Sequence, residues 1–455
     1  MTRPVSADTA GRTARRSARD LAAYRGEILH FLGDPALLGD AGHRHLPDGV
    51  LVVANGCVVD LGSAEAVLPT LPAATHITDY RGKLLMPGFV DTHIHYAQTD
   101  IIASHGGQLL EWLESYTFPE EARFADSAHA AEVAGFFIDE LLRNGTTTAM
   151  VYATVHPTSV DAIFNAAEAV SMRLIAGKVL MDRNAAPYLL DTATSGYEDS
   201  KALIERWHDR GRLGYAVTPR FAPTSSPEQL ASCGRLLDEH PGVYLQSHLA
   251  ENRAEVAWVG ELFPDARSYL DVYDRFGLVR PRAVYAHCLH LDGHDRRRMA
   301  DAGAAMSFCA TSNLFLGSGL FDAQSAADLG VRVGIGTDVG GGTSFSMLRT
   351  LDESYKVLQM AGQQLSPLRA FYLATLGGAS SLYLDDRIGS FQVGREADFV
   401  VLDPVATPLL ARRMSRVRTL NEKLFALMIM GDDRAVCATH VLGQPVYRRD
   451  AVGVR

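Results

Sequence analysis

Two histidines separated by one residue end an apolar run early in the chain. The run is PGFVDTHIH at residues 87–95, and its histidines are His93 and His95. Side chains on a strand alternate between its two faces, so both imidazoles point the same way. Two imidazoles on one face can bind one metal ion together. The chemistry of this chain therefore depends on whether later segments complete a metal site.

Polar residues of the same kind close other apolar runs. His248, His287 and Asp338 each stand at or near the end of such a run. A lone histidine or aspartate at a strand end is usually structural, but this set together with the first two histidines argues against coincidence. Four histidines and one aspartate form a composition that suits Zn²⁺ or Fe²⁺.

Eight apolar, strand-like runs must position these side chains, and amphipathic segments of helix length separate most of them. Continuous apolar strands alternating with helices are typical of a parallel sheet covered by helices. Eight such units predict a (β/α)₈ TIM-type barrel of the α/β class, whose chemistry lies at the carboxyl ends of the strands. The predicted strands are 84–95, 146–153, 173–180, 215–223, 243–251, 283–291, 305–311 and 331–338, and predicted helices include 160–171, 200–209, 227–239 and 293–302.

Both ends of the chain carry short β-like runs that are too few to form a stable sheet alone. Together they predict one small β-sandwich domain beside the barrel. The expected organisation is a disordered tail at 1–20, the first part of the sandwich at 21–83, the metal-dependent hydrolase barrel at 84–387 and the second part of the sandwich at 388–455.

Composition excludes several classes of protein. The formal net charge is −10, and no long basic stripe is present, which argues against a nucleic-acid partner. No apolar run is long enough to span a bilayer, so no membrane is expected. The five cysteines include no CxxC pair, and residues 1–20 lack the apolar core of a secretory signal. A cytoplasmic location with reduced thiols is therefore expected.

Several segments carry a resemblance to a known family. The chain resembles the amidohydrolase superfamily and, within it, the guanine deaminases, from about residue 24 to the C-terminus. Ala97 and Ala310 stand where that family usually has proline, and these departures leave the substrate preference open. The segments that carry the resemblance are PGFVDTHIH at 87–95, HIHYAQTD at 93–100, QLLEWL at 108–113, YTFP at 116–119, SHLAEN at 247–252, TSNLFLGSGLF at 311–321 and GTDVGGGTS at 336–344.

The resemblance implies a mononuclear zinc deaminase that converts guanine and water to xanthine and ammonia. One Zn²⁺ per chain is expected, with Fe²⁺ as the alternative, and a homodimer is expected. The implied metal ligands are His93, His95, His248 and Asp338. The implied catalytic residues are Glu251 as proton shuttle, His287 as hydrogen-bond donor to the attacking oxygen, and Asp338 as acceptor of a proton from the water. The implied substrate contacts are Gln98, Arg220 and Phe221.

Three alternatives remain open. A two-metal site would need a bridging lysine, most often on strand four. Strand four ends TPRF at 218–221 and has no lysine there, while Lys178 lies on strand three. Because Glu251 is also present, a single metal is favoured. The substrate could be another amino-heterocycle, namely 8-oxoguanine, an aminotriazine such as ammeline, or a pterin. A catalytically inactive binding or scaffold homologue would be marked by loss of a ligand or of Glu251, and none is lost.

Residues 99–124 are predicted to form a lid over the barrel mouth.

Overall fold

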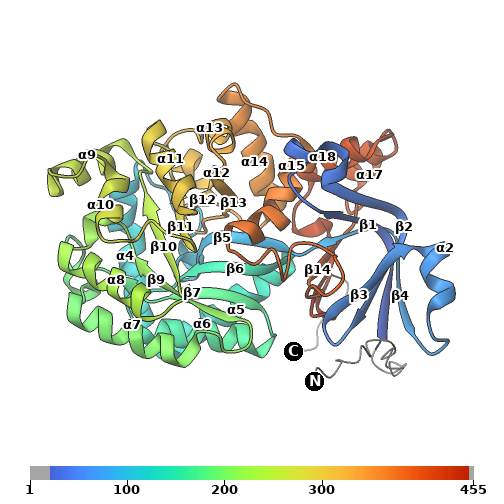
Figure 1. Ribbon diagram of the computed structural model, residues 1–455, viewed down its shortest axis with the longest axis horizontal. Helices are drawn as coiled ribbons and strands as arrows, with labels where there is room; N and C mark the ends of the chain where they lie inside the picture. Colours follow the sequence, from blue (N-terminus) through green and yellow to red (C-terminus); the bar gives the residue numbers. More distant parts are fainter. Residues whose placement is uncertain (1–20, 450–455) are drawn as a thin grey trace, which may run out of the picture.

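The computed structural model describes residues 21–449, and the expected disordered tail at 1–20 lies outside the described residues. Two sheets organise the chain (Figure 1). One is a nearly closed barrel of parallel strands surrounded by helices, and the other is a separate sheet built from both chain ends. The α/β fold class with a (β/α)₈ TIM-type barrel is thereby confirmed.

The barrel strands follow one another in chain order, and every pair is parallel. The first and last strands approach through two backbone hydrogen bonds, from Asp338 N to His93 O and from His95 N to Val339 O, both 2.9 Å. The strands are β5 (Phe89–His95), β6 (Thr146–Tyr152), β7 (Arg173–Gly177), β9 (Leu213–Pro219), β10 (Tyr244–Leu249), β11 (Ala283–His287), β12 (Ala305–Phe308) and β13 (Arg332–Ile335), with β8 (Val179–Leu180) paired to β9.

Burial explains why these runs are strands. Every residue of β5, β6, β9 and β11 is buried, because the barrel interior covers one face and the helices cover the other. Side-chain caps define where the helices begin; Ser226 caps α8 and Asp292 caps α11. The surrounding helices are α5 (Ser127–Arg143), α6 (Pro157–Ala169), α7 (Ala193–Trp207), α8 (Pro227–Glu239), α9 (Arg253–Leu262), α10 (Tyr269–Arg275), α11 (Gly293–Ala302), α12 (Ala310–Phe315), α13 (Ala323–Asp328) and α14 (Met347–Met360).

The predicted first strand, 84–95, proves to be two strands in different sheets. Residues up to Pro87 belong to β4 (His76–Pro87) of the second sheet, and β5 begins at Phe89. Gly88 lies between them, where a Cβ atom would come within 2.0 Å of the Thr147 hydroxyl oxygen. Apolar character is continuous across this change of sheet, so hydrophobicity alone does not reveal it.

The second sheet joins the two ends of the chain. Its strand order is β16-β15-β14-β4-β1-β2-β3, and the central antiparallel pairing of β14 with β4 links the C-terminal strands to the N-terminal ones. Aromatic packing supports this junction, since the rings of Tyr24 and Phe399, one from each end of the chain, meet edge to face with centroids 4.9 Å apart. The remaining strands are β1 (Leu21–Phe31), β2 (His43–Ala54), β3 (Cys57–Ser63), β14 (Phe399–Leu402), β15 (Val436–Val441) and β16 (Gln444–Arg448).

Further helices lie outside the ring around the barrel strands or in its loops. Between residues 21 and 449, no helix has both the length and the apolar character needed to cross a bilayer. These helices are α1 (Pro35–Leu38), α2 (Ala64–Val67), α3 (Leu109–Trp112), α4 (Phe118–Ala122), α15 (Pro367–Tyr372), α16 (Gly378–Ser381), α17 (Pro408–Met414) and α18 (Leu420–Met430).

Candidate metal centre and active site

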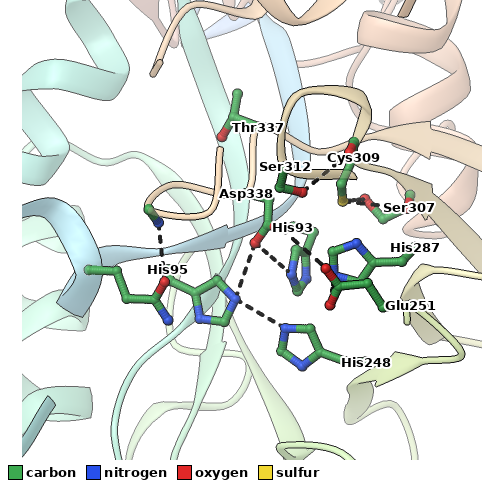
Figure 2. A network of polar contacts seen from close by, with 12 residues as sticks. His93, His95, His248, Glu251, His287, Ser307, Cys309, Ser312, Thr337 and Asp338 are labelled. Carbon is green, nitrogen blue, oxygen red and sulfur yellow. Dashed lines mark hydrogen bonds and ion pairs between the residues drawn. The ribbon is translucent and has the colours of Figure 1, made fainter. Parts of the chain in front are cut away.

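The structure brings the four predicted metal ligands together at the carboxyl edge of the barrel (Figure 2). His93 and His95 come from β5, His248 from β10, and Asp338 from the segment after β13. Asp338 Oδ1 lies 3.1 Å from His93 Nε2 and 3.3 Å from His95 Nε2. The Nε2 atoms of His95 and His248 are 3.2 Å apart.

This donor set fits a divalent metal ion. One ligand atom from each of the four residues lies within 4.8 Å of the others. Apart from its 3.1 Å contact with Asp338, the buried Nε2 of His93 has no hydrogen-bond partner among the described residues. Burial lowers the pKa of His95 to about 3. Burial, with the neighbouring imidazoles, also holds the pKa of His248 well below its ordinary value. Neutral imidazoles beside a carboxylate offer lone pairs, as Zn²⁺ or Fe²⁺ requires.

Asp91 connects the first and last barrel strands behind this cluster. Its carboxylate accepts hydrogen bonds from the backbone N–H of Thr337 at 3.1 Å and of His93 at 3.2 Å, and from the Thr337 hydroxyl. Burial raises the pKa of Asp91 to about 7 despite these donors. Asp91 thus supports the backbone on both sides of the cluster, a role that its place in the 87–95 motif did not reveal.

The backbone is locally strained where two of the site residues stand. His287 has a φ of 69° and Asp338 a φ of 53°. Left-handed backbone is unusual for residues other than glycine and clusters at functional sites. His287 is the last residue of β11 and Asp338 follows β13, so each strained residue turns its side chain toward the barrel mouth.

Glu251 and His287 lie beside the metal-ligand cluster (Figure 2). His287 Nε2 is 3.4 Å from Glu251 Oε2 and 3.8 Å from Asp338 Oδ2. Burial, together with the nearby charge of Asp338, raises the pKa of Glu251 to about 8. A carboxyl group that gains and loses protons near neutral pH is suited to general acid–base catalysis.

Neighbouring residues hold these two side chains in place. The Ser318 hydroxyl donates to Glu251 Oε1 at 3.0 Å. Glu255 Oε2 accepts from the backbone N–H of Glu251 at 3.0 Å and, in the capping box that begins α9, from that of Asn252 at 3.1 Å. Asn313 Oδ1 lies 2.8 Å from His287 Nδ1. The sequence did not predict these roles. Ser318 and Asn313 lie inside the 311–321 segment, and the resemblance of that segment to the family was the only indication that they matter.

A pocket lies over the cluster. Its lining includes Gln98, Arg220 and Phe221, the three predicted substrate contacts, so the structure places them beside the metal ligands. Its lining residues are His95, Gln98, Leu109, Trp112, Leu113, Arg220, Phe221, His248, Glu251, Glu255, His287, Leu316, Asp338 and Gly341.

The segment predicted as a lid contributes part of this wall. Leu109, Trp112 and Leu113 line the pocket from α3 and the helical turn that follows it. Gln108 Oε1 accepts a hydrogen bond from Asn252 Nδ2 at 3.2 Å, which joins this segment to the start of α9. The segment therefore covers the barrel mouth with apolar side chains.

Two other sequence features have structural explanations. Lys178, considered above for a second metal, is buried and pairs with Asp191 at 2.5 Å, so its amine is already engaged. In the glycine run at 340–342, a Cβ atom on Gly342 would lie 1.8 Å from Thr337 O. Glycine is needed there because two backbone segments approach closely.

The chain is similar to several known proteins. Residues 84–446 match the model of the Amidohydrolase family. The chain is 53% identical over 433 residues to guanine deaminase of Escherichia coli (strain K12), covering 94% of this chain and 98% of that protein. The solved structure of E. coli guanine deaminase matches with a TM-score of 0.91 at 52% identity, covering 94% and 99%. That of C. acetobutylicum guanine deaminase with bound guanine in the active site matches with a TM-score of 0.84 at 28% identity, covering 94% and 100%.

Proposed function

The chain belongs to the amidohydrolase family, and from that premise we propose that it is a metal-dependent hydrolase that converts guanine and water to xanthine and ammonia. One observation carries the proposal: a single pocket is lined by members of the metal-ligand cluster, by Glu251 and by the polar side chains of Gln98 and Arg220. The similarity to proteins named guanine deaminase, one with guanine bound, supports this choice of substrate.

We propose zinc as the metal, one ion per chain, held by the three histidines and Asp338; Fe²⁺ suits the same ligands. When bound, such an ion lowers the pKa of a water molecule toward neutrality and polarises the bond under attack. The buried, neutral imidazoles supply lone pairs, and Asp338 supplies the negative charge.

The protein's own groups move the protons. Water adds to the ring carbon that carries the amino group, so a C–O bond forms and the C–N bond breaks. Asp338 accepts a proton from the attacking water, and His287 donates a hydrogen bond to its oxygen. Glu251 carries protons to the adjacent ring nitrogen and to the departing amine, which leaves as ammonia.

The pocket wall orients the purine. Arg220 offers a fork of N–H donors to the ring carbonyl, and Gln98 offers an amide to the ring edge. Phe221 is buried beside them and packs edge-on to Trp258, with ring centroids 6.3 Å apart. Its ring provides an apolar surface for the purine.

Turnover measurements test the proposal. The purified protein is assayed for ammonia release with guanine, adenine, 8-oxoguanine, an aminotriazine and a pterin. Guanine is expected to have the highest kcat/KM, since a site built around a carbonyl rejects rings that leave its donors unpaired. If another ring is preferred, the proposed substrate is wrong, although the deaminase chemistry would stand.

We further propose that the enzyme is a homodimer, works in the cytoplasm and serves purine catabolism. The homodimer follows from the family resemblance alone. Light scattering at micromolar concentration tests it, with a mass of about twice the 49.3 kDa chain expected and a monomer mass contradicting it.

A further inference from the structure

A buried carboxylate lies behind the polar wall of the pocket. Glu121 on α4 is fully buried and is not among the residues that line the pocket. Both of its oxygens accept hydrogen bonds from Arg220 Nη1, at 2.8 and 2.9 Å. Oε1 also accepts one from Gln98 Nε2 at 3.2 Å. A single carboxylate therefore contacts both polar side chains that we assign to the purine.

The contact with Glu121 determines what Arg220 can offer to a ligand. A guanidinium has five N–H donors in a rigid fork, and Glu121 occupies the Nη1 side. The guanidinium carbon lies 5.6 Å from the ring centroid of Phe118, which restricts it further. The donors on Nε and Nη2 are left for the pocket. The backbone carbonyl of Arg220 also accepts a hydrogen bond from His248 Nδ1 at 2.7 Å. Arg220 therefore links the substrate contacts to the metal-ligand cluster.

Glu121 also determines the orientation of the Gln98 amide. Gln98 Oε1 accepts a hydrogen bond from the backbone N–H of Gly340 at 3.2 Å, while Nε2 donates to Glu121. A flipped amide would set oxygen against the carboxylate and nitrogen against an N–H group, so both contacts would become repulsive. The second Nε2 hydrogen remains available to a ligand.

The ion pair also sets the charge of the wall. Arg220 and Glu121 together are neutral, and both are buried. A neutral wall suits a neutral ring that accepts hydrogen bonds at a carbonyl, whereas an unpaired buried arginine would favour an anion. We propose that Glu121 is the positioning residue of the specificity pocket, holding Arg220 and Gln98 in the orientation that reads a neutral carbonyl-bearing ring. This inference rests on the proposed function.

The first test compares guanine with 2-aminopurine, the same ring without the carbonyl. Glu121→Gln is expected to raise KM for guanine about 10- to 100-fold, the usual cost of losing an outer support of a site residue, while kcat falls less. The inhibition constant of 2-aminopurine should change less than about threefold, and the metal content should not change. Glu120→Gln is the matched control, because Glu120 neighbours Glu121 on α4 but pairs with Arg123; its kinetics should equal those of the wild type.

The second test uses Arg220, and it remains informative if the Glu121→Gln variant does not fold. Arg220→Met leaves Glu121 buried without a counter-charge, which is strongly destabilising. The double variant Arg220→Met/Glu121→Gln removes that charge, so it should unfold at a higher temperature than Arg220→Met alone. Its kcat/KM for guanine should equal that of Arg220→Met within about threefold, because the amide oxygen of a glutamine at 121 can still accept from Gln98 Nε2, and the other contact of Glu121 is to Arg220.

Two results would overturn the inference. One is an equal loss of affinity for guanine and 2-aminopurine in Glu121→Gln. The other is a double variant that is less stable and less active than Arg220→Met, with additive losses. Failure of the proposed function looks different, since the wild-type protein would then not deaminate guanine, and the order of the melting temperatures would still test the pairing.

Discussion

At the level of single residues, burial decides which protonation state each group adopts in this site. Burial holds the histidines of the cluster neutral and raises the pKa of Glu251 to about 8. The pKa of Asp338 is instead held well below its ordinary value, because the surrounding imidazoles outweigh the effect of burial. The pKa values of two carboxyl groups in one pocket, Glu251 and Asp338, are therefore shifted in opposite directions. Such a separation is what assigns acid and base roles to a pair of titratable groups.

Replacing Glu251 by Gln tests the proton shuttle. Gln keeps the shape and can still accept a hydrogen bond from Ser318, but it cannot carry a proton. The variant should keep its metal and lose roughly 10²-fold or more in kcat with guanine. Glu261→Gln, at the exposed end of α9, is the control and should retain wild-type turnover. Near-normal activity in the Glu251 variant would show that another group moves the protons.

Metal analysis tests the ligand set. The wild-type protein should contain one divalent ion per chain, and His248→Ala should retain far less than one, because the remaining ligands no longer close the site. His294→Ala is the control, since His294 belongs to a separate, largely exposed Asp292–Asp295 cluster. Two ions per chain in the active wild-type enzyme would instead favour a dinuclear site.

The sequence predicted those residues whose position follows from local geometry. The histidine pair on β5 is an example, because strand alternation alone places both imidazoles on one face. Glu121 could not be found this way. Its contact with Arg220 joins residues 99 positions apart and depends on how α4 packs against the barrel. Asn313 is similar, because its contact with His287 depends on where α12 packs.

At the level of elements, the accuracy of the predicted bounds varied from one element to the next; the predicted helix 200–209, for example, covers only the second half of α7. The predicted helices 227–239 and 293–302 coincide with α8 and α11, where a capping side chain marks each start. The predicted strand 283–291 was too long, since β11 ends at His287. Residues after the strand stay buried because they build the site, so their apolar character continues while their backbone geometry changes.

The second sheet contains a buried histidine that should make stability depend on pH. His440 on β15 donates from Nδ1 to Gly443 O and accepts from the Tyr80 hydroxyl at Nε2, which requires the neutral ring. Burial lowers its pKa to about 4. Between pH 6.5 and 4 the unfolded chain binds the proton and the folded chain does not. Stability is therefore fully present above pH 6.5 and is lost as the pH falls toward 4, by about 3 kcal/mol from this group.

Urea unfolding at several pH values measures this effect. The wild-type midpoint should fall steeply from pH 6.5 to 4, and His440→Gln should lose part of that dependence. His76→Gln, at an exposed position on β4, should behave as the wild type does. An unchanged pH dependence in the His440 variant would show that protonation of this ring does not limit acid stability.

At the level of the whole molecule, a charged cluster joins the barrel to the sheet of the chain ends. Arg212, just before β9, donates to Glu396 at 2.6 Å and also pairs with Asp398. Arg173 on β7 pairs with the same Glu396. Asp398 leads into β14, and its Oδ1 accepts from Leu442 N at 2.8 Å. These contacts lie at the amino-terminal ends of the barrel strands, the face that stabilises such barrels, away from the catalytic edge.

Replacing Arg212 by Met should therefore reduce stability without reducing the chemistry. The substitution keeps an apolar stem but leaves Asp398 buried without this cation and Glu396 with only Arg173. Breaking a buried pair on one side costs several kcal/mol, so the free energy of unfolding should fall by about 3 kcal/mol. Metal content and kcat/KM of the folded fraction should stay at wild-type values. Arg81→Met, which removes an exposed pair with Asp79, should leave the free energy of unfolding close to that of the wild type. An Arg212 variant as stable as this control would mean that apolar packing alone holds the two sheets together.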